Sequence, residues 1–114
     1  MGYDLENRVM KFAQSVINFT RSLKRNEANR VLVNQVLRSA TSIGANYVEA
    51  NHSSSKKDFK NKISISRKEA SESRYWLELI KNANPERNDE CSTLWKESHE
   101  LTLIFSSIFA KTKF

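Results

Sequence analysis

The sequence predicts an all-α protein, an antiparallel four-helix bundle with up-down-up-down topology. Four long segments carry apolar residues at helical spacing, and only short polar stretches join them. The 114 residues include only two glycines and one proline, too few for the many turns of a β-sandwich or barrel. With 39% hydrophobic and 28% charged residues the chain is expected to fold around a core. We expect a single domain over residues 1–114.

The first two helices are predicted from their apolar stripes. The first places apolar residues three and four positions apart, at Leu5, Val9, Phe12, Val16, Phe19 and Leu23. It is expected to end near Arg25, where basic side chains meet the negative end of the helix dipole. Asn26 is a suitable cap for the second helix, predicted over residues 27–50.

The third and fourth helices meet at Asn84 and Pro85, because proline stops one helix and is tolerated in the first turn of the next. Ser55, with Asp58 three residues later, resembles a capping box and begins the third helix. The fourth helix is expected to bury an apolar face made of Leu94, Trp95, Leu101, Ile104, Phe105, Ile108 and Phe109.

Basic side chains follow one edge of the third helix. We call this row the basic ridge; it consists of Lys56, Lys60, Arg67, Arg74 and Lys81. Residues 51–81 hold eight basic and four acidic residues, and the whole chain has a formal net charge of +6. Such a row suits phosphate backbones, because neutralising phosphates releases condensed counterions. An exposed face that only aids solubility explains the charge equally well.

The candidate nucleic-acid contacts are four residues of this ridge and a neighbouring lysine: Lys56, Lys57, Lys60, Arg67 and Arg74. No aromatic stacking platform or base-reading motif is apparent in the sequence. Binding is therefore expected to depend on phosphates, weaken with salt and show little sequence preference.

A polar stripe runs beside the apolar face of the second helix. Its members, with two carboxylates of the third helix, are Gln35, Arg38, Ser42, Asn46, Glu49, Glu69 and Glu72. If the stripe faces the third helix, Arg38 can pair with Glu69 or Glu72, and Asn46 can specify the register. A structural network is favoured over a ligand-binding surface.

The sequence contains no arrangement of residues that is typical of a catalytic site. Glu49 and His52 have the spacing of one half of a di-iron site, but the second Glu-x-x-His copy is missing, so no metal or cofactor is expected. Cys91 stands alone near the start of the last helix, where a thiol pKa can fall, yet a small buried residue is the favoured interpretation. We expect a non-enzymatic protein.

The cellular setting is predicted from what the sequence lacks. A single cysteine cannot form an internal disulfide, and charged residues interrupt the N-terminal apolar pattern. The apolar stretch at 101–110 is far shorter than the roughly 20 residues of a membrane helix. We expect a cytoplasmic protein without a membrane span.

Three segments together resemble a known family. They are residues 37–50 (LRSATSIGANYVEA), residues 55–59 (SKKDF) and residues 65–77 (ISRKEASESRYWL). The combination resembles the bacterial four-helix bundle family named after the 23S rRNA intervening-sequence protein, which is related to the accessory variability determinant of diversity-generating retroelements.

This resemblance implies a small bundle that assembles into a homopentamer and, in the retroelement relative, a basic surface that engages nucleic acid and a reverse transcriptase. Six residues match the polar signature of the family: Arg38, Ser42, Asn46, Glu49, Glu69 and Glu72. The function expected is an oligomeric bundle that binds structured RNA. The alternative is a scaffold or accessory module that binds only protein partners.

Overall fold

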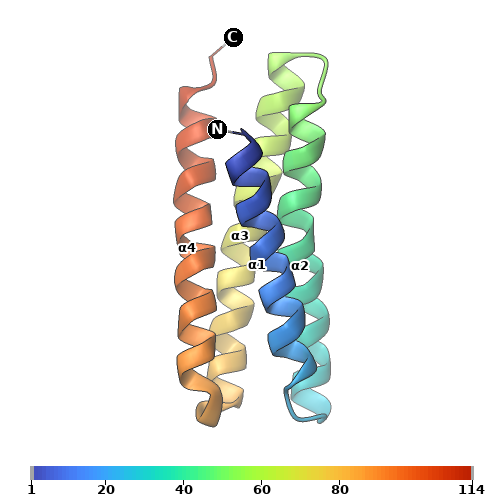
Figure 1. The fold of residues 1–114 in the computed structure, drawn as a ribbon, viewed down its shortest axis with the longest axis vertical. Helices are drawn as coiled ribbons and strands as arrows, with labels where there is room; N and C mark the ends of the chain where they lie inside the picture. The colour runs from blue at the N-terminus through green and yellow to red at the C-terminus, as the bar shows by residue number, and fades with distance from the viewer. Residues whose placement is uncertain (1, 114) are drawn as a thin grey trace.

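The computed structural model describes residues 2–113 as four α-helices and one short 3-10 turn (Figure 1). The elements are α1 (Gly2–Arg21), α2 (Glu27–Asn51), α3 (Lys56–Ala83), η1 (Pro85–Arg87) and α4 (Asn88–Lys111). Successive helices run in opposite directions, so both ends of the chain lie at the same end of the molecule (Figure 1). The predicted all-α four-helix bundle is confirmed.

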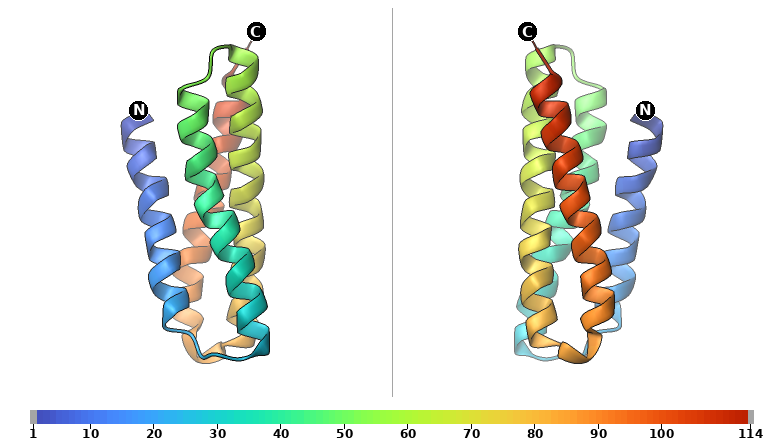
Figure 2. Two further views of the ribbon diagram at one scale, coloured as in Figure 1. Left: turned by 90° about the vertical axis from the view of Figure 1, so that its right-hand side faces the viewer. Right: turned by 90° about the vertical axis from the view of Figure 1, so that its left-hand side faces the viewer.

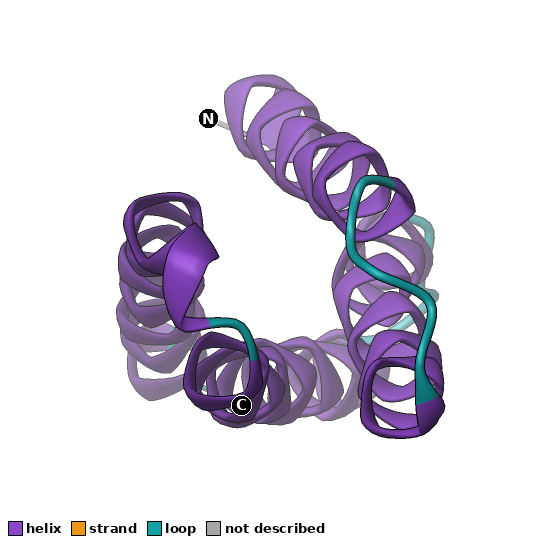
Figure 3. Ribbon diagram, turned by 90° about the horizontal axis from the view of Figure 1, so that it is seen from below, coloured by secondary structure: helices purple, strands orange, loops and turns teal. Residues whose placement is uncertain are grey.

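The helices are not equally close to one another. The molecule measures 47 × 20 × 19 Å, and α3 packs extensively against both α2 and α4. In contrast α1 packs mainly on α2 and leans away from α4 towards its own N-terminus (Figures 2 and 3). An Arg8 guanidinium joins the two, donating to Glu97 at 2.7 and 2.8 Å and to Glu100 at 2.8 Å.

The core consists of the apolar stripes that the sequence predicts. Val16 of α1, Ile43 of α2, Leu77 of α3 and Leu101 of α4 are all fully buried. The largest fully buried side chain is Phe105, whose ring meets that of Tyr47 edge to face at 5.5 Å between centroids. Burial of such side chains, worth about 1.5–3 kcal/mol each, holds the four helices together.

Small residues bring α2 and α3 close together. The hydroxyls of Ser39 and Ser73 lie 2.8 Å apart, and the Ser66 hydroxyl donates to the Ile43 carbonyl at 2.9 Å. All three serines are buried. Each buried hydroxyl therefore has a partner, which offsets the cost of removing it from water.

Helix starts follow the sequence prediction, whereas one helix end does not. The side chain of Asn26 accepts from the Asn29 amide at 2.9 Å, and Ser55 accepts from the Asp58 amide at 3.0 Å. The prediction that the first helix ends near Arg25 was wrong, because α1 ends at Arg21. Residues 22–25 connect α1 to Asn26, the N-cap of α2, whose backbone is extended. The chain therefore leaves the helical conformation before it reaches this cap.

A buried amide pair connects the two joints at the lower end of the bundle. The Asn29 side chain donates to Asn84 at 3.0 Å, and Asn84 donates back to Asn29 at 2.9 Å. Asn29 also donates to the Lys24 carbonyl, and Asn84 to the Ile80 carbonyl. The joint between α1 and α2 is thereby fixed to the end of α3.

Within the described chain, none of the helices has both the length and the apolar character needed to cross a membrane.

Candidate nucleic-acid interface

The basic ridge lies along the edge of α3 that faces α4. Lys60, Arg67 and Arg74 recur every seven residues, a rise of about 10.5 Å per step along the helix. The Lys60 ammonium and the Arg67 guanidinium both lie 4.4 Å from the centroid of the Phe109 ring. The ring of α4 therefore orients two of the cations by cation–π contact.

Arg74 is oriented by a second group of rings. Its guanidinium lies 5.7 Å from the Trp95 ring centroid, and its Nη1 donates to Nδ1 of His99. The Trp95 and His99 rings stack at 5.4 Å with an interplanar angle of 13°. Because a guanidinium has no acceptor, His99 accepts this hydrogen bond through an unprotonated nitrogen.

The two ends of the ridge differ in exposure and in charge pairing. Lys56 and Lys57 are exposed at the start of α3, whereas Lys81 lies 4.0 Å from Glu78.

Over residues 2–113, neither Lys56 nor Lys57 has a carboxylate within ion-pair distance. The same holds for Arg67 and Arg74. Four of the five candidate nucleic-acid contacts thus keep their positive charge uncompensated.

The aromatic rings beneath the ridge are a feature that sequence reasoning missed. Trp95 and Phe109 were expected in the core, but both are only half-buried and lie beside the cations of α3. The sequence pattern did not show that these rings contact the cations of the ridge. These contacts could have been found by aligning α3 and α4 in antiparallel directions, since that alignment places Lys60 opposite Phe109 and Arg74 opposite Trp95.

The structure brings Arg38 to both carboxylates named from the sequence. Its guanidinium lies 3.2 Å from Glu69 Oε2 and 2.7 Å from Glu72 Oε1. Hydrogen bonding to Glu69 is the main cause that raises the pKa of Arg38 above its usual range, with a further contribution from Glu72. Side-chain exposure of Glu69 is only 8%, so this ion pair is partly shielded from water.

The other members of the polar stripe do not join this cluster. Asn46 donates within α2, to the Ser42 carbonyl at 2.9 Å, and Glu49 pairs with Lys62 of α3. The Gln35 side chain makes no hydrogen bond to the described residues. The seven residues therefore form separate contacts and not one continuous network.

Two buried polar atoms on α3 lack a partner among the described residues, Glu69 Oε1 and Trp76 Nε1. They are seven residues apart on one flank of the helix, on the side of Arg38 and away from the basic ridge. Leaving a buried polar atom unpaired costs about 1–3 kcal/mol, so this flank would be stabilised by an additional hydrogen-bonding partner.

Cys91 is a buried thiol, as the favoured interpretation predicted. It is fully buried at the start of α4. Burial raises the pKa of Cys91 to about 11, so the helix start does not activate the thiol. In the part of the chain that the structure describes, no three His, Cys, Asp or Glu side chains are grouped so as to hold a metal ion.

The fold and this site define a class, that of small antiparallel four-helix bundles with a cationic edge. The chain belongs to the 23S rRNA-intervening sequence protein family, whose profile matches residues 3–107. It is also similar to a crystal structure of a protein of unknown function from the S23 ribosomal protein family of Bacteroides thetaiotaomicron. That protein is 33% identical with a TM-score of 0.81, over 91% of this chain and 96% of the other. A search of curated proteins finds no match.

Proposed function

We propose that this protein is a non-enzymatic, oligomeric bundle that binds structured RNA through the basic ridge. The observation that carries the proposal is the regular row of Lys60, Arg67 and Arg74, in which both arginines lack a carboxylate partner within residues 2–113. Cytoplasmic RNA, including ribosomal RNA, is the expected partner, and the family name is consistent with this source.

The geometry favours phosphate recognition. The rings of Phe109 and Trp95 restrict the arginine side chains, so less side-chain entropy is lost when a phosphate binds. Their positive charge also remains available, because contact with an aromatic face does not neutralise it. Lys56 continues the same row to the α2–α3 joint, and Lys57 lies beside it.

A salt titration tests the proposal. Affinity for a ribosomal RNA stem-loop is measured between 50 and 300 mM salt by fluorescence anisotropy, for the natural protein and for Lys60→Gln/Arg67→Gln. We expect the logarithm of the association constant to fall by about 3–4 per logarithm of salt for four phosphate contacts, and by about two fewer in the variant. Glutamine keeps much of each side chain, so packing on Phe109 is largely retained.

The matched control is Lys11→Gln/Lys68→Gln, which removes two exposed charges that lie outside the ridge. This variant is expected to change affinity less than twofold at 150 mM salt. Equal losses in both double variants would show that only net charge matters. No binding at 50 mM salt, or an affinity that salt does not change, would overturn the proposal.

Self-association is the second part of the proposed function. Large apolar side chains are exposed on several faces, at Met10, Val31, Val48, Tyr75 and Leu103. Of these, Tyr75 lies against Trp76, and the unpaired atoms Glu69 Oε1 and Trp76 Nε1 on α3 favour a partner surface there. The family resemblance suggests five subunits, which light scattering of the purified chain would test; a monomer at 100 μM would refute this part.

The alternative function, a scaffold that binds only proteins, uses the same exposed apolar residues and leaves the ridge without a role. Charge reversal at Lys60 and Arg67 separates the two functions. A scaffold retains its protein partner in this variant and has no RNA affinity to lose, whereas the RNA-binding protein loses RNA and keeps its assembly.

A further inference from the structure

A pocket of about 340 Å³ lies between the last turns of α3 and the first turns of α4, at one end of the basic ridge. Five residues line it: Glu78, Lys81, Ser92, Trp95 and Lys96. Lys81 belongs to the ridge and follows Arg74 by seven residues, about 10.5 Å along the helix. A polyanion bound along the ridge therefore reaches the pocket.

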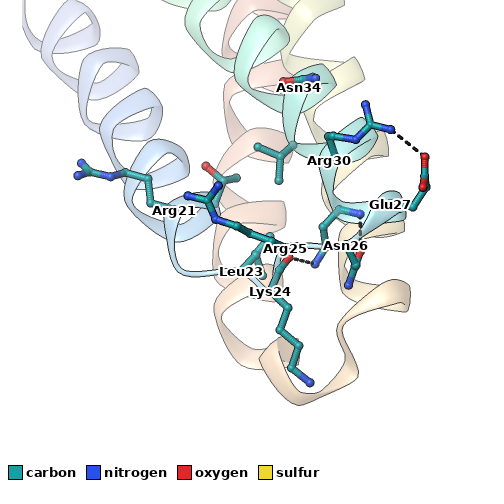
Figure 4. A pocket seen from close by; sticks show the side chains of 11 residues that line it. Arg21, Leu23, Lys24, Arg25, Asn26, Glu27, Arg30 and Asn34 are labelled. Atoms are coloured by element: carbon teal, nitrogen blue, oxygen red, sulfur yellow. Dashed lines mark hydrogen bonds and ion pairs between the residues drawn. The ribbon is translucent and has the colours of Figure 1, made fainter.

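A larger cavity, of about 460 Å³, lies at the joint between α1 and α2 (Figure 4). Its basic side chains extend in different directions: Arg21 and Lys24 point away from each other, and Arg30 pairs with Glu27 at 2.8 Å (Figure 4). These cations do not converge on one ligand. The smaller pocket instead combines an aromatic ring with a carboxylate and two ammonium groups.

The indole of Trp95 forms the aromatic wall of the smaller pocket. This side chain is half-buried, because its ring stacks on His99 and contacts the guanidinium of Arg74. Neither His99 nor Arg74 lines the pocket, so these two leave uncovered the part of the indole that faces it. Unpaired nucleobases stack on open aromatic rings that lie beside rows of cations.

Glu78 and Lys81 add a polar edge to the pocket. They are three residues apart on α3, and Lys81 Nζ lies 4.0 Å from Glu78 Oε2, too far for a direct hydrogen bond. Both groups therefore keep hydrogen-bonding capacity for a ligand. A carboxylate only accepts and an ammonium only donates, so the edge presents acceptors beside a donor.

Guanine is the base whose Watson–Crick edge matches this pair of side chains. Its N1–H and its 2-amino group are adjacent donors for the two oxygens of a carboxylate, and its O6 accepts from an ammonium. Adenine, cytosine and uracil each present a single donor group next to an acceptor, which a carboxylate would repel. A site that hydrogen-bonds two donors discriminates strongly against ligands that lack one of them.

We propose that this pocket binds an unpaired guanine of the RNA that lies on the ridge. The base stacks on Trp95 and directs its Watson–Crick edge at Glu78 and Lys81. Lys96 is exposed, has no carboxylate within ion-pair distance over residues 2–113, and binds the adjoining phosphate. The inference rests on the proposed RNA binding and adds recognition of one base to a contact made mainly with phosphates.

Four stem-loop RNAs with a five-nucleotide uridine loop test the proposal. They differ only in the central loop nucleotide, which is guanosine, inosine, adenosine or uridine, and their affinity is measured by fluorescence anisotropy at 150 mM salt. We expect the guanosine loop to bind at least fivefold more tightly than the adenosine and uridine loops. Inosine lacks the 2-amino donor, so its affinity should lie in between.

The variant Glu78→Gln removes the carboxylate, and Glu86→Gln makes the same change of net charge at an exposed residue outside the pocket. We expect Glu78→Gln to reduce the preference for guanosine below twofold, whereas Glu86→Gln keeps it. Affinity for the uridine loop should change equally in the two variants, since both remove one negative charge.

Equal binding of the guanosine and adenosine loops by the natural protein would overturn this proposal and leave RNA binding by the ridge intact. A preference that survives Glu78→Gln, or one that Glu86→Gln removes equally, would also overturn it. Absence of binding to all four RNAs at 50 mM salt would overturn both the guanine site and the proposed function.

Discussion

The buried amide pair of Asn29 and Asn84 offers a sharp test of how the joints hold the bundle. Asn84→Ala removes both hydrogen bonds between the side chains, at 3.0 and 2.9 Å. The Ile80 carbonyl stays satisfied, because it also accepts from the backbone amide of Asn84 at 2.9 Å. The side-chain oxygen of Asn29, a residue only 2% exposed, loses its partner.

The magnitude follows from these contacts. An unpaired buried oxygen costs about 1–3 kcal/mol, which includes the loss of its own hydrogen bond, and the second hydrogen bond of the pair adds about 1 kcal/mol. We therefore expect Asn84→Ala to lower the free energy of unfolding by about 2–4 kcal/mol. For a domain of this size the midpoint of thermal unfolding falls by about 10 °C or more.

Urea unfolding followed by circular dichroism, at one fixed protein concentration, measures the loss. In the double variant Asn29→Ala/Asn84→Ala no orphaned amide remains, so its cost should be smaller than the sum of the single costs by about 1–2 kcal/mol. Asn82→Ala, an exposed change on the same turn, is the control and should cost less than about 0.5 kcal/mol. Strict additivity, or a loss below 0.5 kcal/mol for Asn84→Ala, would refute the reasoning.

Three further predictions concern other parts of the bundle. Burial raises the pKa of Cys91 from about 9 to about 11, so as the pH rises the thiol ionises in the unfolded chain before it ionises in the folded one. The free energy of unfolding, measured in urea, should therefore fall by about 2 kcal/mol between pH 8 and 10.5 when compared with that of Cys91→Ala. Arg8→Ala breaks the contact with Glu97 and should cost about 0.5–1 kcal/mol, with faster hydrogen exchange in α1 before any change in α3. A Cβ at Gly44 would lie 3.3 Å from Val9 Cγ2, so the branched side chain of Gly44→Val should cost about 1–3 kcal/mol in thermal unfolding; no loss would show that α1 moves aside.

Local signals explain why the helices could be predicted. The caps Asn26 and Ser55 act on amides only three residues away, so their effect is visible in a short stretch of sequence. The stop at Pro85 is equally local, although a 3-10 turn precedes α4 there. The end of α1 was misplaced because its position depends on the span to α2, which no short window contains.

The contacts of the candidate site depend on how each helix is rotated about its axis. Arg38 could be matched with Glu69 and Glu72, because opposite charges on facing stripes limit the choices. The position of Phe109 beside Arg67 was missed, because an apolar ring at the edge of a stripe looks the same in sequence as one in the core. The amide pair was missed because its two asparagines are 55 residues apart.

The charged side chains on the two sides of α3 have different partners. Towards α2, Arg38 pairs with the carboxylates Glu69 and Glu72, which leaves these three residues with a net charge of −1 and no excess of positive charge. Towards α4, Arg67 and Arg74 meet aromatic rings and not acids, so their charge remains available to solvent. A net charge spread evenly over the surface would attract polyanions only weakly. Because paired and unpaired charges lie on different sides of α3, the positive field is concentrated on one edge of this helix. The proposed RNA binding therefore predicts a larger loss of affinity from changes at that edge than from equal changes of charge elsewhere.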